Sequence, residues 1–244
     1  MKTLLFLAIA CLKLVTNPLI SQITTGSITM SIIDIKTTEI EAADEMMGIS
    51  ELLKNTDMTI YFNPNETVTE VNMIGTMDTK IFFKNDRTTQ YIDQMGQKMK
   101  MSTSASPDSD AELNAKEKYQ ITYHKNDTKE ILGYQCYKTT ILTQMKRPSS
   151  EDILEDQTTD IELVWYITEE IKMNHFGIYR MPGLIVNGTP LRMDINLGNL
   201  TLTYEATSIS KKVDRSKFEK PTGDYKEISS EELENMGLPT SGKN

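Results

Sequence analysis

The stretch Leu191-Arg192-Met193-Asp194-Ile195-Asn196-Leu197 decides the fold, because apolar and polar side chains alternate along it. A similar alternation runs through residues 200–206 and through Ile161-Glu162-Leu163-Val164-Trp165-Tyr166-Ile167. Successive side chains of a β-strand point to opposite faces, so this period of two predicts strands with one apolar and one wetter face. Antiparallel sheets commonly bury one face and leave the other in water, which predicts an antiparallel sheet.

Further short segments upstream have the same strand character and are separated by turn residues such as Asn63-Pro64-Asn65 and Asn85-Asp86. They are residues 28–32, 58–62, 67–74, 80–84, 88–92, 97–101, 120–124 and 134–143. Such evenly spaced strands predict an antiparallel meander. An amphipathic helix is expected over 41–54, and Ser229 followed by acidic residues predicts a helix start. The fold class is therefore mainly β (α+β), a curved antiparallel sheet with short covering helices.

Length and charge narrow the classes of function. The chain has 244 residues and 38% hydrophobic side chains, enough for one β-rich domain, which we place at residues 23–244. Polar loops are expected near 102–117 and 146–160. The net charge of −9 argues against a nucleic-acid partner, which needs a basic face.

The N-terminus predicts export. Met1-Lys2 precedes an apolar run from Leu4 to Leu12, the pattern of a secretory signal peptide over residues 1–22, with cleavage near Ser21 or Gln22. The run is too short to span a membrane, so the mature chain has no transmembrane span. We expect a periplasmic or extracellular location. As an alternative, Ala8-Ile9-Ala10-Cys11 resembles a lipoprotein cleavage site that would anchor the protein through Cys11.

No catalytic, cofactor-binding or metal-binding motif is found in the sequence. His124 and His175 lie in unrelated contexts outside zinc-ligand spacing, and phosphate-binding and nucleophile-elbow motifs are absent. Cys136 is expected to be a buried small residue rather than a nucleophile. Glu169-Glu170 imitates a carboxylate pair, but adjacent residues near a strand end point apart, so an exposed turn is expected. The sequence therefore predicts a protein that is not an enzyme and has no cofactor.

The remaining candidate site is apolar. If the cover over the apolar face of the sheet is incomplete, that face lines a pocket; if it is complete, the same residues form a filled core. The candidate lining residues are Ile161, Leu163, Trp165, Met193, Leu202 and Tyr204. The turn at Pro182-Gly183 is the candidate lip of the sheet.

Several short motifs resemble a family of exported bacterial proteins, the domain of unknown function 4412, and the chain is similar to the GLPGLI family as well. The motifs are Met58-Thr59-Ile60-Tyr61-Phe62, Gly133-Tyr134-Gln135-Cys136-Tyr137-Lys138, Val164-Trp165-Tyr166-Ile167-Thr168, Pro182-Gly183-Leu184-Ile185 and the segment from Phe218 to Ile228. The resemblance covers most of residues 24–236 and is thin in the first half.

The resemblance implies a fold related to lipoprotein carriers of the LolA and LolB type, a half-barrel with helices over its mouth. It implies no activity and no catalytic residues. Three hypotheses follow: a non-enzymatic envelope protein that binds an apolar ligand or lipid, a structural or interaction module of the envelope with a filled core, and a hydrolase. The third would need a polar cleft with convergent side chains, which the sequence does not indicate.

Overall fold

The structure is a computed structural model that describes residues 22–37, 53–73, 77–85, 87–104, 119–146, 158–173, 184–196, 200–229 and 232. The strands are β1 Gly26–Thr37, β2 Thr56–Phe62, β3 Glu66–Met73, β4 Met77–Lys84, β5 Arg87–Gln94, β6 Gln97–Ser104, β7 Gln120–Ile131, β8 Tyr134–Lys146, β9 Thr158–Thr168, β10 Thr189–Asn196, β11 Leu200–Ser210 and β12 Lys226–Glu227. A short 3₁₀ helix, η1, spans Arg215–Phe218.

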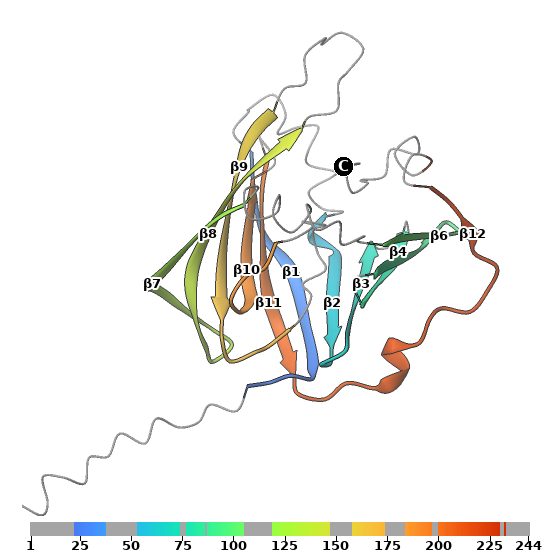
Figure 1. Cartoon of the computed structure of the whole chain (residues 1–244), viewed down its shortest axis with the longest axis horizontal. Helices are drawn as coiled ribbons and strands as arrows, with labels where there is room; N and C mark the ends of the chain where they lie inside the picture. Colours follow the sequence, from blue (N-terminus) through green and yellow to red (C-terminus); the bar gives the residue numbers. More distant parts are fainter. Residues whose placement is uncertain are drawn as a thin grey trace, which may run out of the picture.

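All twelve strands belong to one sheet, in the order β12-β6-β5-β4-β3-β2-β1-β11-β10-β9-β8-β7. Strands β1 to β6 form one meander and β7 to β11 a second, and the antiparallel pairing of β1 with β11 joins them. Figure 1 shows the curvature of this sheet: β1, β2, β10 and β11 lie roughly upright in the view, whereas β4 and β6 are turned across it. The predicted mainly β fold with a curved antiparallel sheet is confirmed.

The register divides the sheet into two faces. We call the apolar face the one that carries Ile60, Ile28 and Ile209 in one cross-strand row, and Trp165, Met193, Tyr204 and Ile32 in another. The second face carries Glu70 and Lys80 at one end and Arg192 and Glu205 at the other. Side chains that lie directly opposite each other in an antiparallel pair share a face, so these rows are continuous across strands.

The joint between the meanders requires a glycine. A Cβ atom at Gly26 would lie 2.2 Å from the backbone oxygen of Ser210 on β11 and 3.3 Å from the Phe62 ring on β2. Strand β1 also contains two register shifts against β11, at Thr29/Met30 and at Ile32/Asp34. Bulges of this kind increase local twist, which is consistent with the curvature of the sheet at its centre.

Two hairpins turn through two-residue loops with left-handed backbone. Met95 and Gly96 have φ of 51° and 84°, and Leu132 and Gly133 have φ of 51° and 83°. Positive φ at both positions is the type I′ turn, whose twist matches that of the flanking strands. Glycine is required second in each pair because it reaches this region without a Cβ penalty.

A large bulge folds the β7–β8 hairpin onto the second face. His124 pairs with Lys138 and Thr128 with Tyr137, so Lys125 to Asp127 are inserted in β7 with no counterpart in β8. Beyond the bulge, Lys129 Nζ lies 2.6 Å from Glu205 Oε2 on β11, although β9 and β10 separate β8 from β11 in the sheet. The hairpin tip therefore lies across these strands.

The Lys129 contact belongs to a charge network on the second face. Arg192 Nη1 lies 3.1 Å from Glu205 Oε2, and Arg192 Nε lies 3.3 Å from Asp194 Oδ1. Burial alone would raise the pKa of Glu205, but hydrogen bonds from Lys129 and Arg192 outweigh it and lower that pKa. The ionised carboxylate therefore links β7, β10 and β11.

The C-terminal segment covers the other half of the second face. After β11 it passes through η1 and ends in β12, which pairs in parallel with β6 at the sheet edge (Figure 1). Lys217 Nζ contacts Glu70 Oε2 at 3.3 Å, and the Tyr225 ring packs edge-on against Tyr91 with centroids 5.1 Å apart. We call residues 211–228 the strap. It covers β6, which would otherwise be an open edge.

Most predicted elements are found, with different bounds. The predicted strands coincide with observed ones, but β7 continues from His124 to Ile131 because the bulge lets it resume pairing. The predicted polar loops overlap the last residues of β6 and β8 and the first of β9, while the rest of both loops lies outside the described residues. Ser229 Oγ accepts from the Glu232 backbone N at 3.1 Å, and Glu232 accepts from the Ser229 N at 2.8 Å, the reciprocal bonds of a capping box. This confirms the predicted helix start.

Three predictions fall largely outside the described residues. They are the signal peptide with Cys11, the covering helices, and the helix over 41–54, of which Leu53 and Lys54 are described and helical. Among the described residues, no helix is both long enough and apolar enough to cross a membrane.

Gly26→Ala should destabilise the protein by roughly 1–3 kcal/mol, because the added methyl overlaps the β11 backbone and must push the two meanders apart. Urea unfolding followed by far-UV circular dichroism measures this. Ser27→Ala, one residue along the same strand, is the control and should change stability by no more than about 0.5 kcal/mol. Equal unfolding midpoints for Gly26→Ala and the unmodified protein would contradict the close approach.

Candidate functional site: an apolar face with buried hydroxyls

The six predicted lining residues come together on the apolar face. Trp165, Met193 and Tyr204 form one cross-strand row over β9, β10 and β11. Leu163 and Leu202 lie in the next row, on either side of Ile195, and Ile161 follows on β9. Four of the six are nearly inaccessible to solvent, with exposures of 0–4%, whereas Ile161 and Tyr204 are half-buried. The period of two thus placed these side chains on a common face.

This face continues beyond the predicted set in both directions. Ile141 on β8 lies opposite Leu163, and Met30 on β1 and Met58 on β2 extend it toward the first meander. These side chains belong to one cluster of buried residues that also contains Ile28, Ile60, Phe62 and Ile195. Pro182 and Gly183, the predicted lip, lie outside the described residues.

Buried threonines interrupt the apolar face at several positions. Thr67 and Thr69 on β3, Thr79 on β4 and Thr139 on β8 are at most 6% exposed. Their register partners include Phe62, Ile60, Val71 and Trp165, which places all four hydroxyls on the apolar face. In the part of the chain that the structure describes, none of these hydroxyls has a hydrogen-bond partner.

The four hydroxyls carry a cost that requires an explanation. A buried polar group without a partner loses about 1–3 kcal/mol of hydration free energy. Thr69 and Thr79 are diagonal neighbours on adjacent strands, since Thr69 lies opposite Ile81 and Thr79 opposite Val71. With Thr67 they form a patch of hydroxyls that can hydrogen-bond a ligand or ordered water. The sequence did not predict this patch, because threonine is common in strands. The available signal was spacing: Thr67, Thr69 and Val71 are two residues apart, which places their side chains on one face of β3.

The Cys136 thiol is inert. The side chain is fully buried, and Sγ donates a 3.6 Å hydrogen bond to the Tyr134 carbonyl oxygen. Burial raises the pKa of the thiol to about 12, with the nearby Glu170 and Glu205 acting in the same direction. The nucleophilic thiolate is therefore scarce at neutral pH. This agrees with the prediction of a structural cysteine.

Among the described residues, His124 does not form a catalytic group with Cys136. His124 Nε2 lies 3.1 Å from the Thr140 hydroxyl on an exposed part of β7, and His175 lies outside the described residues. Among the residues that the structure describes, no group of three or more His, Cys, Asp or Glu side chains is arranged to hold a metal ion.

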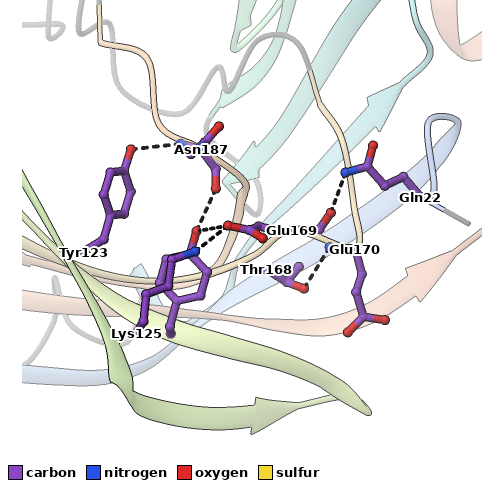
Figure 2. Close-up of polar contacts among 8 residues, drawn as sticks. Gln22, Tyr123, Lys125, Thr168, Glu169, Glu170 and Asn187 are labelled. Atoms are coloured by element: carbon purple, nitrogen blue, oxygen red, sulfur yellow. Dashed lines mark hydrogen bonds and ion pairs between the residues drawn. The ribbon is translucent and has the colours of Figure 1, made fainter. Parts of the chain in front are cut away.

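Glu169, at the predicted exposed turn after β9, anchors a polar cluster (Figure 2). Its carboxylate pairs with Lys125 from the β7 bulge and accepts from the Tyr137 hydroxyl at 2.8 Å. The same hydroxyl lies 2.9 Å from the Asn187 carbonyl oxygen, and the Asn187 N donates to the Tyr123 hydroxyl at 3.1 Å. The cluster ties the bulge region of β7, the first half of β8 and the end of β9 to the segment before β10.

The electrostatics of this cluster suit an anchor rather than acid–base chemistry. Hydrogen bonds from Lys125 and Tyr137 lower the pKa of Glu169. The hydrogen bond to Glu169 also raises the pKa of Lys125, whose Nζ lies 3.6 Å from the centroid of the Tyr137 ring. A general acid or base needs a pKa near the working pH, and both shifts lead away from neutrality.

Comparisons with known proteins give distant likenesses. No family model matches the chain, so membership of the domain of unknown function 4412 or of the GLPGLI family stays a prediction. No curated protein matches it either. Among solved structures, the lipoprotein LppX of Mycobacterium tuberculosis is 11% identical with a TM-score of 0.31, covering 77% of this chain and 88% of that one. LprF of Mycobacterium bovis is 14% identical with a TM-score of 0.33, covering 82% of this chain and 90% of that one.

Thr69→Val should stabilise the ligand-free protein by about 1 kcal/mol, because a methyl group of similar size replaces a buried hydroxyl without a partner. Protein refolded after purification in denaturant provides the ligand-free state, and urea unfolding measures its stability. Thr59→Val is the control: the Thr59 hydroxyl shares a 3.3 Å hydrogen bond with Thr29, so this change should destabilise. A loss of stability in Thr69→Val equal to that in Thr59→Val would show that the Thr69 hydroxyl is satisfied within the protein.

Proposed function

We propose that the protein is a non-enzymatic, exported binding protein whose apolar face holds an amphiphile, with an acyl chain or similar apolar portion along the row of Trp165, Met193 and Tyr204. The observation that carries the proposal is a set of four buried threonine hydroxyls on the apolar face that have no hydrogen-bond partner among the described residues. A filled core favours methyl groups at such positions, whereas a site for a ligand with a few oxygen atoms needs donors and acceptors.

The arrangement of the face supports this ligand class. Thr67, Thr69 and Thr79 gather on β3 and β4, and the long aliphatic stretch from β2 to β9 adjoins them. An amphiphile has the same division, because its polar group needs hydrogen bonds and its chain needs only apolar contact. The inert Cys136 and the charge-paired Glu169 offer no nucleophile or general base, which supports binding over hydrolysis.

One observation favours the alternative of a structural module with a filled core. Leu163, Trp165, Met193 and Leu202 are already 0–4% exposed, as fully packed core residues are. Under this alternative, the protein's own side chains or ordered water satisfy the threonine hydroxyls, and partners bind the outer surfaces. The two functions differ in whether an acyl chain can reach Trp165.

Trp165 is the single tryptophan of the chain and reports directly on this face. A fatty acid brominated along its chain should quench Trp165 fluorescence in a saturable manner, because bromine quenches only on contact. Ile161→Gln should weaken this binding roughly 5- to 150-fold, since an amide without a partner in an apolar site costs about 1–3 kcal/mol.

Val164→Gln is the matched control, because Val164 is a half-buried β-branched residue of the same strand on the opposite face. Its affinity should equal that of the unmodified protein. The proposal fails if bromine does not quench Trp165 in the ligand-free protein, or if the two variants lose affinity equally.

A further inference from the structure

A groove of about 970 Å³ lies between the strap and the second face of the sheet, away from the apolar face. Strands β3 to β6 form its floor. Phe218 of η1 and Lys220, which follows η1, form one wall. The lining residues are Glu66, Phe82, Lys84, Asn85, Arg87, Thr88, Thr89, Lys100, Ser102, Phe218 and Lys220. The register places Phe82 opposite Val68 and Thr89, on the face that Ile60 and Trp165 do not share.

The groove is basic although the protein is acidic. Four cations, Lys84, Arg87, Lys100 and Lys220, line it with the single carboxylate of Glu66, a lining charge of 4 − 1 = +3 in a chain of net charge −9. Like charges gathered in one groove repel each other, and a bound anion relieves that repulsion. The overall negative charge works against attraction from a distance, so the groove acts on an anion at short range.

Two of the cations already have protein partners. Lys84 Nζ lies 3.3 Å from Glu66 Oε2, and Lys100 Nζ lies 3.7 Å from Glu227 Oε1. Within the described residues, neither Arg87 nor Lys220 forms an ion pair, and both are exposed to solvent. Arg87 comes from the start of β5 and Lys220 from the strap, so the sheet and the strap each contribute a cation to the groove.

Apolar and hydroxyl groups complete the lining. The rings of Phe82 and Phe218 come from β4 and η1, and Phe82 is held edge-on against Tyr91 with centroids 5.6 Å apart. Thr89 and Ser102 lie opposite each other on β5 and β6 and supply hydroxyls. The volume is in the range of sites for small organic ligands.

We propose that this groove binds a ligand carrying two or more phosphate-type oxyanion groups, with Arg87 and Lys220 as its principal contacts. The guanidinium of Arg87 offers a planar fork of donors for an oxyanion, and Lys220 offers a mobile point charge. Such a ligand is either a soluble polyphosphorylated molecule or a phosphate-bearing lipid headgroup, and both present the same chemistry to the groove.

Calorimetric titration with inositol hexakisphosphate tests the soluble source, and co-sedimentation with vesicles that contain cardiolipin, whose headgroup carries two phosphates, tests the lipid source. Binding to at least one probe is expected, and it should weaken as salt is added. The double variant Arg87→Gln/Lys220→Gln should lower that affinity by about tenfold or more, as expected for loss of two charge-assisted contacts.

Lys211→Gln/Lys212→Gln is the matched control. It also removes two positive charges, but from exposed strap positions outside the groove. It should stay within about twofold of the unmodified protein, since only the long-range field changes. Quenching of Trp165 by the brominated fatty acid should be unchanged in both variants, which separates this site from the apolar face. The proposal would be overturned if the protein binds neither probe, or if the two double variants lose affinity equally.

Discussion

The pairing of β1 with β11 is the constraint on which the remaining structure depends. Each meander is built from local hairpins, and the apolar face extends across both of them. At this joint Ile28 meets Ile209 and Ile32 meets Tyr204, so the apolar rows of the first meander continue into those of the second. The joint is close enough to require Gly26, and it pairs segments as distant in sequence as Ser27 and Ser210. Bringing such distant residues together costs conformational entropy, so burial of the shared face must stabilise the pairing.

The two faces of the sheet are used differently. On the second face, the hairpin tip beyond the β7 bulge covers one half and the strap covers the other, and ionic contacts hold both in place. On the apolar face, aliphatic side chains run across the strands of both meanders, and buried threonine hydroxyls interrupt them. The two proposed ligands therefore belong to different faces, the amphiphile to the apolar face and the oxyanion ligand to the second face.

The alternation of apolar and polar residues was sufficient to predict the strands, the antiparallel class and the common face of Ile161, Trp165 and Met193. It could not predict the β7 bulge, because inserted residues such as Asn126 and Asp127 look like a turn in the sequence. The strap was missed for a related reason: Phe218 and Tyr225 have no strand periodicity, and their partners on β3 to β5 are distant in sequence. The basic groove was equally hidden, since Arg87, Lys100 and Lys220 come together only when the strap folds back.

The central claim is that an acyl chain, and not the protein's own side chains alone, occupies the apolar face beside Trp165. Isotope-filtered NMR of protein with ¹³C-labelled Met and Ile methyl groups, mixed with an unlabelled fatty acid, tests it directly. The account predicts nuclear Overhauser effects from the acyl protons to the methyl groups of Met193 and Ile161. Acyl contacts confined to exposed methyl groups such as that of Met95, with none to Met193 or Ile161, would contradict it.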